Sequence, residues 1–444
     1  MPIEQSAASP PTDATTHLPL FGVFLAFVVS YFLHLPARLP VLGLIRADFL
    51  LASVCLWTVI LNHGLRDLSE AKPWQYLRLL LVYIAVTIPF VQWPGSVIKL
   101  GIFQFIKGFA FFPLLAGYLS DEKRVRRFLL VFLACQYLRV FEPLYLHVTQ
   151  GYWGEEAYVS GSVWLERLAG GPYDVIGANG LAYVIVTILC FFPTLYAICR
   201  PWILRAALIA SLPVLGYTML LTGSRSGFLA TIVWLGLFVV SSKRKILLLI
   251  AGVAVAATLM TTLTPLQYDR VVSIWSDEAQ NAGTAEGRMD AVESGLRLAL
   301  QGPIAGYGLG TSAEAQYNYL GDPHMAHNLF VEALQEVGVV GTMLFCGFLL
   351  SIFSLLRQSR TAACDAAGDA LQRQALIRGI WLWFLVTLFF ALASYGLSSY
   401  EWYMLGGLAM VLARRPERAG EALPATVSVL PRGDNHGISS VPGV

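Results

Sequence analysis

The segment PHMAHNLFVEALQEVGVVGTMLFCGFLLSIFSLL, residues 323–356, joins a polar start to a long apolar run. From residue 328 onward, the run is long enough to cross a hydrocarbon core of about 30 Å as a helix. Two histidines precede it, and Glu332 and Glu336 lie in its first turns. Carboxylates at that depth in a membrane must find partners or water, so they are functional candidates.

Composition extends this interpretation to the whole chain. The 444 residues are 56% hydrophobic and 13% charged, whereas soluble proteins carry about 25% charged residues. The chain is therefore predicted to be an all-α polytopic membrane protein. Its net charge of +2 does not indicate a nucleic-acid partner, because the basic residues fall in loops where membrane topology explains them.

Twelve apolar runs are predicted to be transmembrane helices. Residues 1–17 lack the basic start of a cleavable signal peptide, so the first run is expected to remain as an anchor behind a disordered cytoplasmic N-terminus. Residues 414–444 are polar and are expected to form a disordered cytoplasmic tail. The predicted spans are 18–36, 41–62, 76–93, 97–118, 128–148, 176–199, 202–221, 226–241, 246–263, 328–356, 377–395 and 400–413.

The distribution of Lys and Arg predicts the sidedness of these helices. With both termini in the cytoplasm, the clusters DEKRVRR (121–127) and SSKRK (241–245) face inward, as the positive-inside rule requires. Two long loops, 149–175 and 264–327, then face outward. The second separates helices 1–9 (18–263) from helices 10–12 (328–413), and its helix-like segment predicts a folded loop with short helices. The arginines that remain outside are Arg38, Arg46, Arg167, Arg225, Arg270, Arg288 and Arg297.

Arg225 lies in LTGSRSG, residues 221–227, a tight outer turn. Flanking glycines let backbone N–H groups approach a ligand, and a guanidinium with two serine hydroxyls suits a phosphate. The alternative is an arginine that reaches the interface from a helix end.

Arg288 begins GRMDAVESGLRLAL, residues 287–300, in which Met289, Val292, Leu296 and Leu300 form one apolar helical stripe. The stripe predicts a helix lying on the membrane or on the bundle. A cation is disfavoured at a helix N-terminus, so Arg288 indicates an anionic partner; the alternative is a surface arginine. Arg270 stands beside Asp269 and is expected to be solvated.

The glycine-rich stretch GPIAGYGLGTS, residues 302–312, fits neither dinucleotide-binding nor Walker spacing. We expect it to be a flexible turn near the membrane and do not predict nucleotide binding.

His327 is placed above the packed face of the tenth span, which continues through Val331, Leu334, Gly338 and Gly341, because small residues mark close helix contacts. A histidine is suited to accept a proton from a hydroxyl near neutral pH. The alternative is a helix cap or hydrogen-bond partner. A zinc site with His324 lacks the HExxH spacing. The six cysteines form no CxxC and are predicted to form neither disulfides nor a metal site.

Charges also fall within the predicted spans. Arg139 and Glu142 are spaced i, i+3, which is compatible with mutual neutralisation. Lys99 and Lys107 lie in the fourth span. Such charges could line a transport path, but we prefer structural ion pairs.

In combination, TGSRSG, GRMDAVESGLRLALQGPIAGYGLG and HNLFVEALQEVGVVG resemble the O-antigen ligase and polysaccharide polymerase superfamily of bacterial envelopes, over residues 176–345. The resemblance implies a C-type membrane glycosyltransferase of the inner membrane, with a periplasmic site and no metal or nucleotide cofactor. Its substrates would be an undecaprenyl-diphosphate-linked glycan and a hydroxyl acceptor.

The resemblance also implies roles for individual residues. Arg225 and Arg288 would hold the diphosphate, and His327 would deprotonate or orient the acceptor hydroxyl. Asn328, Glu332 and Glu336 would support them. The favoured function is ligation of O-antigen to lipid A–core. The alternatives are a polymerase that uses a lipid-linked glycan as acceptor, a protein O-oligosaccharyltransferase, and a transporter of lipid-linked sugars.

Overall fold

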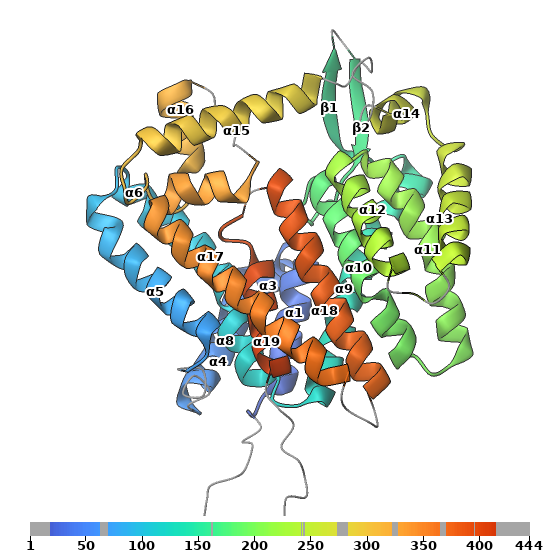
Figure 1. Ribbon diagram of the computed structural model, residues 1–444, viewed down its shortest axis with the longest axis horizontal. Coiled ribbons are helices and arrows are strands. Elements are labelled where there is room, and N and C mark those ends of the chain that lie inside the picture. Colours follow the sequence, from blue (N-terminus) through green and yellow to red (C-terminus); the bar gives the residue numbers. More distant parts are fainter. Residues whose placement is uncertain are drawn as a thin grey trace, which may run out of the picture. The chain divides into compact units, whose positions relative to one another are not determined.

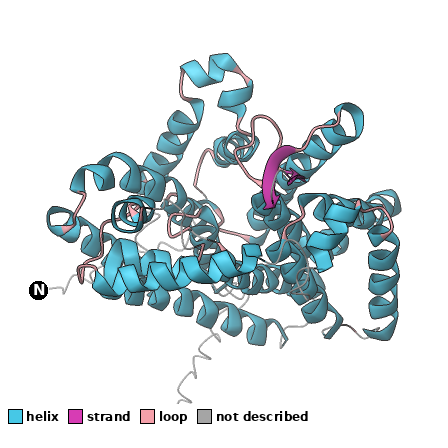
Figure 2. Ribbon diagram, turned by 90° about the horizontal axis from the view of Figure 1, so that it is seen from above, coloured by secondary structure: helices cyan, strands magenta, loops and turns pink. Residues whose placement is uncertain are grey.

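A computed structural model of the protein describes residues 18–62, 70–160, 163–240, 242, 245–272, 283–321, 327–364, 370–394 and 396–413. The described residues are mostly helical, and their strands are confined to one hairpin (Figure 2). This confirms the predicted all-α class. A bilayer favours this outcome, because a helix satisfies its own backbone hydrogen bonds where water is absent.

Seven helical segments in the described part of the chain are long and apolar enough to cross a membrane. They are Lys72–Phe90, Pro94–Tyr118, Glu122–Gln150, Ala178–Ile198, Trp202–Thr222, Leu329–Thr361 and Leu371–Ala393. The remaining predicted spans fall on shorter helices. These are α1 (Phe21–Leu33), α4 (Ala47–Leu61), α12 (Arg225–Val240), α13 (Lys245–Met260) and α19 (Tyr400–Ala413). The number of twelve spans and their orientation stay predictions.

One end of the bundle carries a strand hairpin and three further helices (Figure 1). There, strands β1 (Gly154–Ser160) and β2 (Val163–Leu168) pair antiparallel, with Glu155 opposite Arg167. The same end holds α14 (Pro265–Val272), α15 (Gly283–Gln301) and α16 (Ser312–Leu320). The hairpin lies in the segment 149–175, for which the sequence predicts only a long loop.

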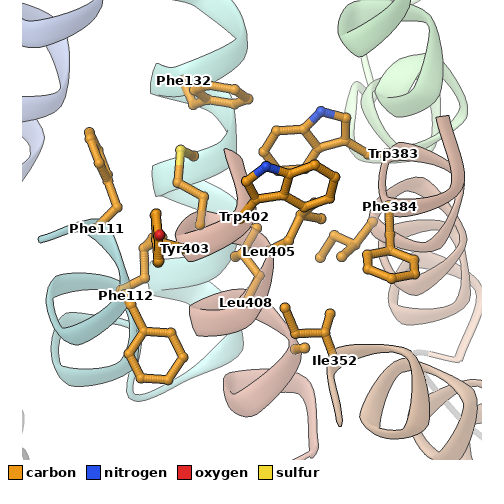
Figure 3. Packing of buried hydrophobic residues seen from close by; sticks show 14 of the residues in the cluster. Phe111, Phe112, Phe132, Ile352, Trp383, Phe384, Trp402, Tyr403, Leu405 and Leu408 are labelled. Atoms are coloured by element: carbon orange, nitrogen blue, oxygen red, sulfur yellow. The ribbon is translucent and has the colours of Figure 1, made fainter. Parts of the chain in front are cut away.

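Large aromatic side chains fill the core of the bundle. Helix α19 packs against α8 (Phe111–Tyr118), and α10 (Ala178–Ile198) packs against α18 (Ala370–Phe390). Trp383 of α18 and Tyr403 of α19 are fully buried, and Figure 3 shows them with Phe112 and Phe132 in one cluster. In a bilayer, close packing of such rings, and not their removal from water, holds together the helices that carry the site described below.

The buried ion pairs differ from the predicted ones. Arg139 of α9 (Glu122–Gln150) does not neutralise Glu142; it donates two hydrogen bonds to Asp174, of 2.6 and 2.9 Å. Glu142 instead accepts from Arg38 at 2.6 Å. Sequence spacing favoured the local pair, but the partners lie in other segments.

Lys99 and Lys107 are exposed, and neither forms an ion pair with any residue that the structure describes. The Lys107 ammonium lies 4.4 Å from the centre of the Phe103 ring. The preferred prediction of structural ion pairs is therefore wrong for both lysines.

Helix α17 (Leu329–Cys364) is broken at Gly338, whose φ of 63° and ψ of −170° are not helical. The break exposes two carbonyls to the glycine-rich stretch 302–312. The Tyr307 N–H donates to the Gln335 carbonyl at 2.7 Å, and the Gly308 N–H donates to the Glu336 carbonyl at 3.0 Å.

The glycine-rich stretch is therefore packed into the bundle, contrary to the expected flexible turn. A Cβ on Gly338 would lie 1.9 Å from the Ile304 carbonyl oxygen, so only glycine permits this approach. On its other side, the stretch meets Gly101, where a Cβ would lie 2.0 Å from the Leu309 carbonyl oxygen. Gly338 was predicted to pack against a neighbouring helix. It packs against this loop instead.

Candidate functional site

A cavity of about 400 Å³ lies where the hairpin, α10 and the ends of α17, α18 and α19 meet. His327 is part of its wall. The cavity volume is in the range typical of small-molecule sites, about 300–1,000 Å³. Its lining consists of Glu155, Val175, Ile176, Gly177, Asn179, Gly180, Tyr183, His327, Leu329, Thr387, Phe390, Ala391, Ala393, Ser394, Ser399, Glu401 and Trp402.

His327 has an unusual backbone conformation and directly precedes a helix cap. Its φ of 47° is left-handed, a conformation that few non-glycine residues adopt. Asn328 follows and caps α17: its side-chain oxygen accepts from the N–H groups of Phe330 at 3.0 Å and Val331 at 3.2 Å. The Asn328 amide also donates to the Leu392 carbonyl at 3.3 Å. The cap therefore fixes the residue that follows His327 against the end of α18.

The turn TGSRSG connects α11 (Trp202–Thr222) to α12. Its residues cap both helices. Gly223, with a φ of 54°, ends α11 in the left-handed conformation. The Ser224 hydroxyl accepts from the Gly227 N–H at 3.2 Å and so caps α12. Ser224 and Ser226 are buried, which contradicts the idea that both hydroxyls face a phosphate. Arg225, at the start of α12, is half-buried.

Two buried arginines fix this turn from outside. Arg167 of β2 donates to the Thr222 carbonyl at 2.9 Å, and Arg270 of α14 donates to the Gly223 carbonyl at 2.8 Å. Cations at a helix C-terminus are favoured by its dipole. Arg270 is only 6% exposed, so the expectation of a solvated arginine was wrong. Both arginines are unusual as cations in predicted outer loops, but the sequence does not predict these helix-terminal contacts.

Asn179 connects the turn to the cavity. Its side-chain oxygen accepts from the Ser224 hydroxyl at 2.8 Å and from Arg167 at 2.9 Å. Arg167 also donates to Glu155 at 2.7 Å. Asn179 and Glu155 both line the cavity. The cationic turn and the His327 cavity are thus neighbouring parts of one polar network, which no motif in the sequence predicted.

Glu332 and Glu336 are both buried and hydrogen-bonded. Glu332 accepts from the backbone N–H groups of Gly396 at 2.7 Å and Leu397 at 3.3 Å. Glu336 accepts from the Ser312 hydroxyl at 3.0 Å. Neither lines the cavity. Glu332 fixes the segment that leads into α19, and Glu336 fixes the end of the glycine-rich stretch.

Helix α15, which carries Arg288, is anchored to α17. The Gln335 amide is fully buried and donates to the Gly295 carbonyl at 2.8 Å. The predicted apolar stripe faces away from the protein, since Met289 and Leu300 are 71% and 74% exposed, and Leu298 is the buried leucine. The side chain of Arg288 lies outside the described residues.

The other predictions at this end concern metal binding. Within the described ranges, no group of three or more His, Cys, Asp or Glu residues is placed to hold a metal ion. His324, the second histidine of the opening segment, lies outside the described residues.

Comparison with known families addresses the same region. Residues 206–346 match a family model described as O-antigen ligase. This match supports the predicted resemblance to the O-antigen ligase and polymerase superfamily. It includes the turn with Arg225, all of α15, the glycine-rich stretch and the first half of α17. A search of curated proteins found no match to the chain.

The O-antigen ligase domain does not include the whole site. Glu155, Arg167 and Asn179 precede the match, and Glu401 follows it. The cavity wall is therefore built partly from matched residues such as His327 and partly from the flanking helices and the hairpin.

Proposed function

We propose that this protein transfers a glycan from an undecaprenyl-diphosphate carrier to a hydroxyl acceptor, with inversion at the anomeric carbon. The observation that carries the proposal is the position of His327 in the cavity wall, next to the network that holds the Arg225 turn. The matched O-antigen ligase domain supports this class of reaction in general.

In the proposed reaction, the acceptor hydroxyl attacks the anomeric carbon while the bond from that carbon to the diphosphate oxygen breaks. His327 takes the proton of the hydroxyl, or orients the hydroxyl for attack. The reaction releases undecaprenyl diphosphate and forms one glycosidic bond. Strained backbone at a residue of this kind is characteristic of functional sites, and His327 has the left-handed φ of 47°.

Arg225 and Arg288 would hold the diphosphate and stabilise its charge as it leaves. Guanidinium groups suit this task because they bind phosphate oxygens in a bidentate manner. Arg167 and Arg270 fix the Arg225 turn through its carbonyls. We assign Asn328, Glu332 and Glu336 to support, because their hydrogen bonds fix the segments around the cavity.

We further propose that the chain crosses the bacterial inner membrane twelve times, with both termini in the cytoplasm. Residues 264–327 would then form the large periplasmic segment between helices 1–9 and 10–12. The Lys and Arg clusters at 121–127 and 241–245 support this orientation. The cavity would open to the periplasm, and α14 and α15 would lie on the periplasmic side.

Lipid A–core is the acceptor that we favour, which makes the protein an O-antigen ligase. Purified protein in liposomes should be given an undecaprenyl-diphosphate glycan with either lipid A–core or further donor as acceptor. Glycan on lipid A–core is the expected result, whereas growth of the lipid-linked chain would make the enzyme a polymerase. Movement of the donor across the liposome without transfer would show a transporter and overturn the proposal.

A further inference from the structure

The cavity wall has an uneven distribution of charge. It contains Glu155, Glu401, His327 and Asn179. Neither Lys nor Arg is among the lining residues that the structure describes. Arg225 lies in the neighbouring turn, and Arg167 and Arg270 bind the carbonyls of that turn. Of these cations, Arg167 also binds the lining residue Glu155.

The two carboxylates have different surroundings. The Glu155 carboxylate already has two hydrogen-bond donors: it accepts hydrogen bonds from Arg167 at 2.7 Å and from the Ala178 N–H at 2.6 Å. Glu401 comes from the first turn of α19 and hydrogen-bonds to Tyr400. Arg139 also acts on Glu401, but Arg139 is itself bound to Asp174. Unlike Glu155, Glu401 thus has no ion-pair partner among the described residues.

This lining matches the chemistry of an uncharged sugar. Hydroxyl and N-acetyl N–H groups can donate to a carboxylate, and Tyr183 and Trp402 supply aromatic surface in the same wall. A sugar carboxylate would instead face Glu401 without a Lys or Arg partner among the described lining residues. Burying a sugar carboxylate beside a second carboxyl group, without a cationic partner, is unfavourable.

We propose that Glu401 makes this cavity selective for a reacting sugar that carries no carboxylate, and that the site discriminates against hexuronic acids. This inference rests on the proposed function, because it takes the His327 cavity as the place where the sugar binds. It adds a specificity-determining residue that lies outside the matched domain.

The test compares two synthetic probes, polyprenyl-diphosphate N-acetylhexosamine and polyprenyl-diphosphate hexuronic acid. Both binding and transfer are measured on the full-length protein in nanodiscs. We expect the wild type to bind the N-acetylhexosamine probe at least about tenfold more tightly. Glu401→Gln should remove most of this preference, while Glu401→Asp, which retains the charge, should keep it.

Glu156→Gln is the matched control, since Glu156 is the next residue of β1, is exposed and does not line the cavity. Its preference should equal that of the wild type. Equal binding of both probes by the wild type, or an unchanged preference in folded Glu401→Gln, would overturn the inference. Selective binding without transfer to any acceptor would support it while contradicting the proposed function.

Discussion

The side-chain oxygen of Asn179 accepts a hydrogen bond of 2.8 Å from the Ser224 hydroxyl. Asn179 lines the cavity that contains His327, and Ser224 precedes Arg225 in the turn between α11 and α12. This contact therefore links the proposed proton acceptor to the proposed diphosphate site. The two residues are far apart in sequence, and the packing of α10 against α11 and α12 brings them together.

Asn179→Ala should lower the rate of glycan transfer. The substitution removes the acceptor shared by Ser224 and buried Arg167, and losing a hydrogen bond to a charged group costs about 1.5–3 kcal/mol. We expect a decrease in kcat/KM of about tenfold or more in the liposome assay. Asn318→Ala, at an exposed position of α16, is the control. A wild-type rate for Asn179→Ala would show that the link has no functional role.

Arg225→Ala should raise the donor KM and lower kcat, because it removes a cation from both the bound and the leaving diphosphate. Arg225→Lys should restore only part of the activity, since an ammonium group lacks the bidentate geometry of a guanidinium. Donor titrations with both variants provide the measurement. Arg297→Ala is a suitable control because Arg297 is exposed and paired with Glu293. Full activity of Arg225→Lys would contradict bidentate recognition.

Gly338→Ala should destabilise the protein by about 2 kcal/mol or more, because alanine disfavours a positive φ and its Cβ would displace the Ile304 carbonyl. The melting temperature of the detergent-solubilised protein tests this. Gly236→Ala, in α12 where a Cβ meets nothing within 4 Å, should leave the melting temperature unchanged or raise it. Equal effects of the two substitutions would argue against the packed glycine-rich stretch.

Asp174 should make stability depend on pH. Burial alone would raise its pKa, but hydrogen bonds from His34 and Arg139 outweigh burial and lower the pKa from its ordinary 3.8. A lowered pKa stabilises the fold above 3.8, and this contribution is lost as the pH falls through the folded-state pKa.

At pH 7, Asp174→Asn should therefore cost about 3 kcal/mol, since it leaves Arg139 buried without its counter-ion. The difference from the wild type should shrink below pH 3.8. Melting curves of both proteins between pH 7 and pH 3 would show this, and a difference that stays constant with pH would contradict it.

The sequence was sufficient to predict the helices, because long apolar runs in a bilayer have few other options. The choice of His327 and the 222–227 turn as site residues rests on polar residues where apolar ones are expected and stays a prediction, although the structure places His327 in the wall of a cavity. Tertiary partners were not predictable in this way. Arg139 and Glu142 are spaced as a local pair, yet each binds a residue from another segment.

The other differences between the predictions and the structure also arise from partners that lie far away in the sequence. Arg270 looked solvated because Asp269 is its neighbour in sequence, whereas its actual partner is a helix-terminal carbonyl. The apolar stripe of α15 is exposed on the protein, so it does not pack on the bundle, and its placement on the membrane stays a prediction; the contact of Gln335 with the Gly295 carbonyl was not predictable from the stripe. The break at Gly338 depends on a loop that supplies two N–H donors to the broken helix, and no local pattern reveals such an exchange.

Glycan transfer by purified His327→Ala protein is the most direct test of the central claim. His147→Ala is the matched control, because His147 lies on α9 and binds the Tyr152 carbonyl away from the cavity lining. With donor and acceptor in liposomes, we predict that His327→Ala inserts and melts like the wild type but transfers no glycan, while His147→Ala remains active. Transfer by His327→Ala at the wild-type rate would contradict the role of His327 as the group that activates the acceptor.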